Sequence, residues 1–230
     1  MIFGFDLISD LNIEAGAPFD WTNKPTSLFC IIAGNLSNDV STIRRALHHL
    51  SGLYQGVFYI DGATEHLDIY SRDDIHLELQ NLCATFRNVI FLHNNVVVVD
   101  GVALVGINGW NKNTDTDLVD DFQLKCYRFE DIDYLEKTLE KLQLHNDVKK
   151  IVVITNCVPS HHLYFGEAED TNEELYPVSA LYKDTEHKVE KWVYGTYDKI
   201  VDTKLGSINY FNNGKFGRNP YYAKRVEVKV

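Results

Sequence analysis

The sequence predicts an α/β protein in which a layered sheet core packs against helices. Short apolar, β-branched runs such as Leu28–Ala33 and Ile151–Ile154 end in Gly, Asn or Thr-Asn, as strands buried on both faces do. Stretches with helical periodicity lie between these runs, an alternation that is typical of α/β folds. We find no internal repeat, low-complexity tract or linker in the 230 residues, so we expect a single domain over residues 1–230.

Each predicted strand is an apolar run that a turn signal closes. A turn residue can take a backbone conformation that a continuing strand cannot, and Gly, Asn and Asp do so at least cost. In chain order the runs are Ile2–Ile8, Leu28–Ala33, Gly56–Ile60, Val89–Leu92, Val96–Val99, Val102–Gly106, Ile151–Ile154 and Lys191–Tyr194. In the tail, Gly206–Phe211 and Ala223–Val230 alternate between apolar and polar residues, which predicts a closing pair of strands.

The predicted helices lie between the strands. Helix Val40–Leu53 starts after Asp39, a favourable N-cap residue, and carries apolar side chains at helical spacing on one face. Asp73–Phe86 and Asp131–Leu144 show the same spacing, and Leu175–Lys191 is predicted as a further helix.

The composition and the apolar pattern disfavour two classes of protein, nucleic-acid binders and membrane-spanning proteins. Lys and Arg number 22 against 33 Asp and Glu, and a net charge of -11 disfavours a nucleic-acid binder that works by bulk attraction. The longest apolar run, Asn95–Leu104, is too short to span a bilayer and is interrupted by Asp100. The N-terminus lacks a basic signal region, and the four Cys are widely spaced. We therefore expect a cytoplasmic protein with no membrane partner.

Polar residues follow five of the predicted strands, at the edge where layered α/β proteins bind ligands. Read in order, these blocks are Asp10-Leu11-Asn12, Gly34-Asn35, Gly62-Ala63-Thr64-Glu65, Asn156, and Gly195-Thr196-Tyr197-Asp198. Their order and spacing resemble the calcineurin-like metallophosphoesterases, which carry D-x-H, G-D, G-N-H-E/D, a single His after a strand, and G-H-x-H. The segments Phe91–Trp110, Ala180–Tyr182 and Gly206–Gly214 extend the resemblance over nearly the whole chain.

The resemblance implies a layered α/β/β/α fold, a β-sandwich flanked by helices, with a two-metal site at the strand ends. Most metal ligands of the family pattern are replaced in this sequence. Asn12, Asn156 and Thr196 stand where the pattern has His, as does Asp198. Asn35 replaces Asp and Ala63 replaces Asn, while Thr64 occupies the position of the catalytic His.

By this resemblance the first metal position is formed by Asp10, Asn12, Asn35 and Asp198, which all offer an oxygen. Such a weak remnant suits Mg²⁺ or Ca²⁺. The alternative, which we favour, is that no cofactor binds and that Asp10 and Asp198 are hydrogen-bonded to the Asn side chains.

The second metal position keeps only Ala63, Asn156 and Thr196 beside the shared Asn35, and it is expected to be empty. The Thr64 hydroxyl is not acidic enough to protonate a leaving group. His66 is the one nearby substitute, although we expect it to be a surface loop residue. His48 and His49 are expected on a helix surface, and His161-His162 in a loop that borders the old cleft.

These substitutions predict a catalytically inactive protein that uses a metallophosphoesterase-like fold to bind a protein partner. One alternative is a residual metal-dependent phosphoesterase or nuclease. The other is an acidic inhibitor of a nucleic-acid-binding protein, and abundant Asn, Lys, Ile and Tyr are typical of AT-rich genomes such as those of some bacteriophages. Direct binding of nucleic acid is not expected.

Overall fold

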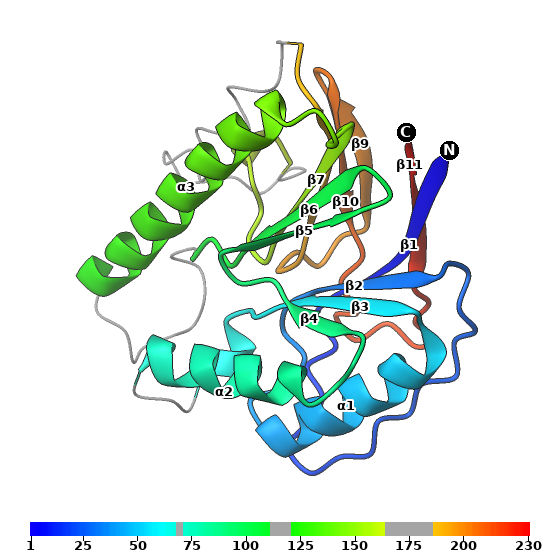
Figure 1. Ribbon diagram of the computed structural model, residues 1–230. Helices are drawn as coiled ribbons and strands as arrows, with labels where there is room; N and C mark the ends of the chain where they lie inside the picture. Colours follow the sequence, from blue (N-terminus) through cyan, green and yellow to red (C-terminus); the bar gives the residue numbers. More distant parts are fainter. Residues whose placement is uncertain (68–70, 111–120, 164–185) are drawn as a thin grey trace.

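The computed structural model describes residues 1–67, 71–110, 121–163 and 186–230, and Figure 1 traces the remaining residues as a thin grey line. The described residues form two sheets and three long helices. Most of the predicted helix Leu175–Lys191 lies outside the described residues. Its described end is not helical, because a strand already begins at Val189.

The first sheet has the order β11-β1-β2-β3-β4. Strands β1 (Ile2–Ile8), β2 (Phe29–Ala33), β3 (Gly56–Ile60) and β4 (Val89–Phe91) run parallel, and β11 (Lys224–Lys229) pairs antiparallel with β1 at one edge. The carboxyl ends of β1, β2 and β3 therefore lie side by side.

The second sheet has the order β5-β6-β7-β8-β10-β9. Strands β6 (Val102–Ile107), β7 (Lys150–Thr155), β8 (Val189–Tyr194) and β10 (Ile208–Asn212) are parallel. The outer strands β5 (Asn95–Val99) and β9 (Val201–Leu205) pair antiparallel with β6 and β10.

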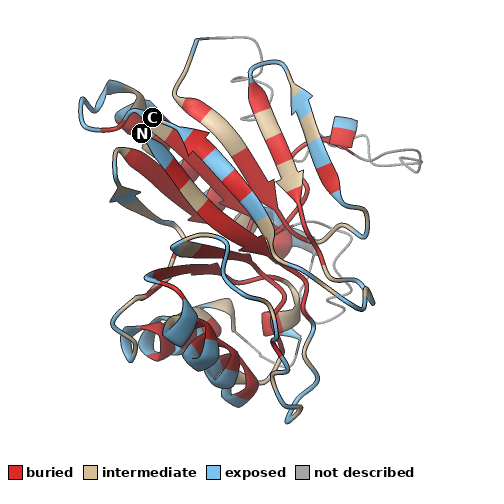
Figure 2. Ribbon diagram, turned by 90° about the vertical axis from the view of Figure 1, so that its right-hand side faces the viewer, coloured by how far each residue is buried: buried red, intermediate tan, exposed pale blue. Residues whose placement is uncertain are grey.

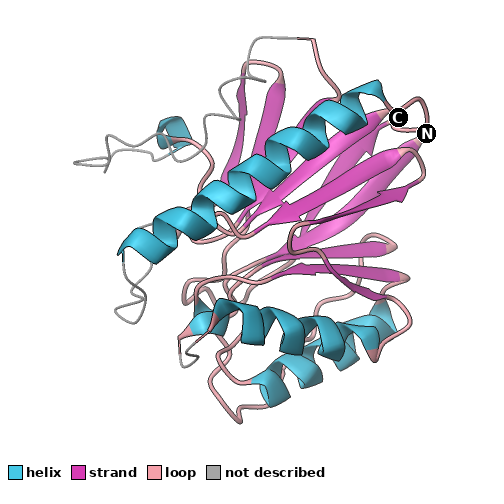
Figure 3. Ribbon diagram, turned by 60° about the vertical axis from the view of Figure 1, so that its left-hand side comes forward, coloured by secondary structure: helices cyan, strands magenta, loops and turns pink. Residues whose placement is uncertain are grey.

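The two sheets pack face to face, and helices cover their outer faces (Figures 1 and 3). Helices α1 (Val40–Leu53) and α2 (Arg72–Ala84) lie on the first sheet, and α3 (Asp121–Leu144) lies on the second. Two short 3₁₀ turns, η1 (Thr64–His66) and η2 (His161–Leu163), follow strands β3 and β7. No helix among the described residues is long and apolar enough to cross a membrane.

An apolar layer between the sheets forms the centre of the molecule (Figure 2). Its fully buried side chains come from both sheets and include Phe5, Leu7, Ile31, Leu104, Val152 and Val193. Burial of apolar surface stabilises the fold by about 25 cal/mol per Å² removed from water, and this drives the two sheets together. Strands β3 and β6 are buried along their whole length, as their continuous apolar sequences predict.

Several predicted bounds are confirmed, including those of β1, β3 and α1, whose Asp39 cap accepts hydrogen bonds from the backbone N–H of Ser41 and Thr42. Helix α3 begins at Asp121, earlier than the predicted Asp131. The predicted closing pair of strands is wrong in its pairing. Strands β10 and β11 lie in different sheets, because the chain crosses between the sheets at Asn213, whose Nδ2 donates to the Leu7 carbonyl at 2.9 Å.

Candidate functional site

The polar blocks predicted from the sequence meet at one edge of the two sheets. Asp10 follows β1, Asn35 follows β2, and Thr64 follows β3, while Asn156 and Thr196 follow β7 and β8 of the second sheet. Parallel pairing aligns the carboxyl ends within each sheet, and hydrogen bonds from Thr196 and Asn156 to residues of the first sheet bring the two sets of ends together. The predicted convergence of these positions is therefore present.

Asn35 is at the centre of this site. Its Nδ2 donates to Asp10 Oδ1 at 2.7 Å and to Thr196 Oγ1 at 3.2 Å. Its Oδ1 accepts from the backbone N–H of Thr64 at 3.0 Å. Both ends of the Asn35 amide are thus used by side chains and backbone of the site itself.

The neighbouring groups are paired in the same way. The Thr196 hydroxyl donates to Asn156 Oδ1 at 2.8 Å, and Asn156 Nδ2 donates to the Ala33 carbonyl at 3.0 Å. The Thr64 hydroxyl donates to Asn12 Oδ1 at 2.8 Å. We call the set Asp10, Asn12, Asn35, Thr64, Asn156 and Thr196 the strand-end network.

The backbone around the network is held in unusual conformations. Asp10, Asn12, Asn35 and Thr196 have φ between 43° and 58°, the left-handed region that Asp and Asn tolerate and that a β-branched Thr rarely adopts. Such conformations persist only where the surroundings enforce them, and here the network hydrogen bonds do so. The site is therefore a fixed structure with little freedom to rearrange.

Asp10 carries the only carboxylate of the network. It is 1% exposed and accepts from Asn35, from the Ser9 hydroxyl at 2.6 Å, and from the Thr196 N–H at 3.0 and 3.1 Å. Burial raises the pKa of Asp10 to about 6, and these hydrogen bonds act in the opposite direction. The carboxylate is thus solvated by neutral donors of the chain.

Two predicted positions do not join the network. Asp198 is exposed, and among the described residues no hydrogen bond or ion pair connects it to Asp10 or to an Asn side chain. It lies in an irregular segment beyond Thr196. Ala63 offers only a methyl group at the start of η1.

Glu65 holds the backbone of the site in place through hydrogen bonds, a role that the sequence did not indicate. Its buried carboxylate accepts from the N–H groups of Asn35 (3.1 Å), Leu36 (2.7 Å) and Gly62 (2.8 Å) and from the Tyr59 hydroxyl (2.8 Å). Burial raises its pKa. One side chain thus fixes the ends of β2 and β3 relative to each other.

A second set of buried polar side chains surrounds Asp61, the residue before Gly62, and the sequence did not predict it. Asp61 Oδ2 lies 2.7 Å from His66 Nε2 and 3.1 Å from His76 Nε2, and Asp61 Oδ1 lies 3.4 Å from His93 Nδ1. We call these four residues the histidine cluster. His66 is 5% exposed, so the expectation of a surface loop histidine is wrong.

Burial and charge act against each other in this cluster. Burial by itself raises the pKa of Asp61, but the charges of His76 and His93 and the hydrogen bonds from His66 and His76 outweigh it and hold the pKa well below its usual value. Burial lowers the pKa of His76. For His93 burial acts in the same direction, but the Asp61 charge outweighs it and the pKa is raised.

The remaining histidines behave largely as expected. His48 and His49 are exposed on α1, and His162 is exposed on η2, whereas the side chain of His161 lies outside the described set. The three histidines of the histidine cluster and its acid could not be linked from sequence. Asp61, His66, His76 and His93 come from a strand end, η1, α2 and the β4–β5 turn, at irregular spacing.

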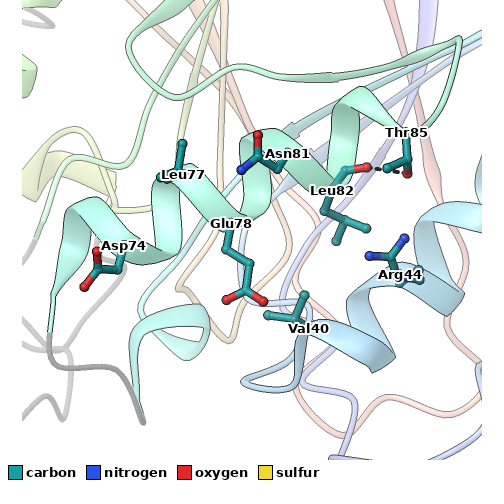
Figure 4. Close-up of a pocket in the computed structure, with 8 residues that line it drawn as sticks. All are labelled: Val40, Arg44, Asp74, Leu77, Glu78, Asn81, Leu82 and Thr85. Atoms are coloured by element: carbon teal, nitrogen blue, oxygen red, sulfur yellow. Dashed lines mark hydrogen bonds between the residues drawn. The ribbon is translucent and has the colours of Figure 1, made fainter.

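Two hollows lie near these elements. One, of about 560 Å³, adjoins the strand-end network at Asn12 and is lined by Trp21, Lys215, Arg218 and Tyr221 among others. The other, of about 370 Å³, lies between α1 and α2 on the outer surface. Figure 4 shows its lining, with Val40 and Arg44 from α1 facing Glu78 and Leu82 of α2. Only the first touches the predicted site.

At the level of sequence, the chain has a viral relative but matches no family. No protein-family model matches the chain. The uncharacterized protein L509 of Acanthamoeba polyphaga mimivirus is 22% identical over 191 residues, which cover 66% of this chain and 66% of the viral protein.

Among solved structures, the phosphopantetheinyl hydrolase of Mycobacterium tuberculosis superposes with a TM-score of 0.66 at 14% identity, over 96% of this chain and 95% of that one. A putative 5'-nucleotidase of Staphylococcus aureus gives 0.58 at 13% identity, over 100% of this chain and 51% of that one. The NAD nucleotidase of Haemophilus influenzae gives 0.51 at 10% identity, over 94% and 45%. The chain thus spans about half the length of the two nucleotidases, and its predicted metallophosphoesterase-like α/β fold is confirmed.

Proposed function

We propose that this chain, which has the fold of metallophosphoesterase-type phosphohydrolases, is a non-hydrolytic binding module for a protein partner. The observation that carries the proposal is the amide of Asn35, which donates to Asp10 Oδ1 at 2.7 Å at the position where the family pattern has a metal-bridging carboxylate. A hydrogen bond between these two groups takes the place of a cation between two anions.

The chemistry of a two-metal hydrolase explains why this matters. Two cations about 3.5–4 Å apart polarise the phosphoryl group and lower the pKa of the attacking water. They need anionic or imidazole ligands, and the strand-end network offers a single carboxylate surrounded by amides and hydroxyls. Its amides at Asn35 and Asn156 are already paired with neighbours, so a metal ion would have to break those hydrogen bonds to bind.

Substituting Asn35 tests this reasoning. Asn35→Asp places a second carboxylate against Asp10 and removes the donor between them, so we expect the free energy of unfolding to fall by about 2 kcal/mol or more at pH 8. Addition of Mg²⁺, which prefers carboxylate oxygens, should recover part of that loss in the variant and leave the wild-type unfolding midpoint unchanged.

Denaturant unfolding with and without Mg²⁺ measures both effects, and the exposed Asn146→Asp is the matched control, since it adds the same charge away from the network. Wild-type stabilisation by Mg²⁺ that Asp10→Ala abolishes would contradict the proposal, because it would place a working cation site at the network.

Hydrolysis is tested directly with bis(4-nitrophenyl) phosphate in Mn²⁺. We expect the wild-type chain and Asp10→Ala to give the same background rate. A wild-type rate that Asp10→Ala abolishes would establish the residual phosphoesterase instead.

The hollow beside the network is our candidate surface for the partner. Lys215 and Arg218 line it together with the acidic Glu14 and Asp20, and Arg218 lies over the Tyr221 ring at 5.3 Å from its centroid. Charged groups of both signs beside aromatic rings suit a segment of another protein that carries an aromatic ring and an acidic group for Arg218. A partner that co-purifies with the chain should be lost with Arg218→Glu and retained with Lys229→Glu, which changes an exposed cation on the edge strand β11. Equal retention by both variants would contradict this surface.

A further inference from the structure

We propose that the histidine cluster is a metal site in which Asp61, His66 and His76 bind one divalent transition-metal ion such as Zn²⁺, with His93 as the fourth ligand. None of these residues belongs to the strand-end network, so this proposal does not rest on the proposed function. Within the described part of the chain, Asp61, His66 and His76 are the one group of three or more His, Cys, Asp or Glu close enough to hold an ion.

The spacing of the ligand atoms fits a single ion. One atom from each of Asp61, His66 and His76 lies within 4.8 Å of the others, and both Nε2 atoms face the same carboxylate oxygen at 2.7 and 3.1 Å. A tetrahedral zinc ion with ligands at about 2.0–2.1 Å holds neighbouring ligand atoms about 3.4 Å apart. Small side-chain shifts therefore open the space that the ion needs.

Two buried atoms of the cluster have no hydrogen-bond partner. These atoms are Asp61 Oδ1 and His93 Nδ1, and they face each other at 3.4 Å. Buried polar atoms in folded proteins are nearly always hydrogen-bonded, so two that make only this long ion pair with each other need an explanation. A metal ion supplies one, because it takes up the free carboxylate lone pair and the free imidazole nitrogen together.

The chemical character of the ligands selects the class of metal. Three imidazoles and one carboxylate suit Zn²⁺ and its neighbours in the transition series far better than Mg²⁺ or Ca²⁺, which prefer oxygen. Asn108 Nδ2 donates to Asp61 Oδ2 at 3.0 Å, the kind of outer hydrogen bond that orients a ligating carboxylate. The buried Asp131 carboxylate, which accepts from Asn94 Nδ2 at 3.1 Å, adds negative charge beside His93.

The surroundings make this a closed site. The side chains of Asp61, His66, His76 and His93 are 0%, 5%, 13% and 11% exposed, and the Trp110 ring covers His66 with centroids 4.7 Å apart. Four protein ligands in a covered position are typical of structural zinc, whereas catalytic zinc keeps a position open for water. The ion would tie the end of β3, η1, α2 and the β4–β5 turn together, so its effect is stability and not turnover.

The test uses the full chain, purified without chelator and with any affinity tag removed. We expect elemental analysis to find one zinc per chain, and Co²⁺ exchange to give the visible absorption of a tetrahedral nitrogen and oxygen site. His76→Gln, which keeps much of the side-chain volume, should weaken Zn²⁺ binding at least about 10-fold, and Asp61→Asn should do the same. His48→Ala, a change at an exposed histidine of α1, should bind as the wild type does.

X-ray absorption of the zinc-loaded wild-type chain keeps the proposal testable if the variants fail to fold. Four nitrogen or oxygen neighbours at about 2.0–2.1 Å are expected. No uptake from excess Zn²⁺, a six-coordinate oxygen shell, or unchanged binding in both His76→Gln and Asp61→Asn would overturn the proposal. Binding lost in Asp10→Ala but kept in His76→Gln would overturn it too, and would also contradict the proposed function, which the other outcomes leave intact.

Discussion

Glu65→Ala is expected to lower the free energy of unfolding by at least about 4 kcal/mol, because each donor left unpaired in the interior costs about 1–3 kcal/mol. Four donors lose their acceptor at once: the N–H groups of Asn35, Leu36 and Gly62 and the hydroxyl of Tyr59. They come from the ends of β2 and β3, so the substitution also releases the two strands that carry the centre of the strand-end network. Chemical denaturation followed by circular dichroism measures the loss.

One further variant separates the role of the Glu65 carboxylate from that of its side-chain volume, and a second variant, at an exposed glutamate, is the control. Glu65→Gln keeps one carbonyl acceptor and should fall between wild type and Glu65→Ala. Glu78→Ala removes an exposed glutamate from α2 and should change stability by less than about 0.5 kcal/mol. If Glu65→Ala lowered the free energy of unfolding by less than about 1 kcal/mol, Glu65 would not hold the ends of β2 and β3 together as its four hydrogen bonds indicate.

Gly62→Ala is expected to have an effect of similar size for a steric reason. A Cβ at Gly62 would lie 2.3 Å from Asn35 Oδ1, 2.6 Å from Asn35 N and 2.7 Å from Asn156 Nδ2. Real Cβ atoms do not approach so closely, so the end of β3 must move away from Asn35 of the first sheet and Asn156 of the second. Overpacking of this kind costs about 1–3 kcal/mol and occasionally more, and the broken hydrogen bonds add to it.

Gly52→Ala is the matched control, because the space around Gly52 in α1 is open. Alanine in a helix is favoured over glycine by about 0.5–1 kcal/mol, so this variant should be as stable as the wild type or more so. Thermal unfolding of both variants provides the comparison. Equal midpoints for Gly62→Ala and wild type would mean that the strand ends can separate without cost.

Much of the fold could be predicted because local pattern and global burial agree in this chain. The strands buried on both faces read as continuous apolar runs, and the Asp39 cap fixes the start of α1. The pairing of β10 and β11 could not be predicted, because alternation indicates a strand without naming its partner. The early start of α3 was missed for a related reason, since its first turns lack the apolar spacing that marks Asp131–Leu144.

The candidate site was predictable in position but not in bonding. Parallel strands bring Asp10, Asn35 and Thr196 together, and that follows from their places after apolar runs. Which amide donates to which oxygen depends on backbone angles such as the left-handed φ of Thr196, which no sequence pattern specifies. Asp198 departs from the network because the turn after Thr196 carries it to the surface.

The sequence singles out His66 alone and does not link it to the other members of the histidine cluster. A ligand set is recognisable from sequence when its members share one helix or one loop, as motifs with fixed spacing do. Here His76 is on α2 and His93 lies beyond β4, and only the packing of α2 against β4 brings their rings to 3.6 Å between centroids. No sequence signal marks these histidines, because their burial is apparent only in the folded structure.

Anomalous diffraction from crystals of the wild-type chain soaked in Mn²⁺ would show whether a cation occupies the strand-end network. We expect no anomalous peak among Asp10, Asn35 and Asn156, with the Asn35 amide still 2.7 Å from Asp10 Oδ1. A peak at the histidine cluster is compatible with that prediction, and its position distinguishes it from the network. One or two peaks between Asp10 and Asn156, with the Asn35 amide turned away, would contradict this expectation and restore the chain to the metal-dependent hydrolases.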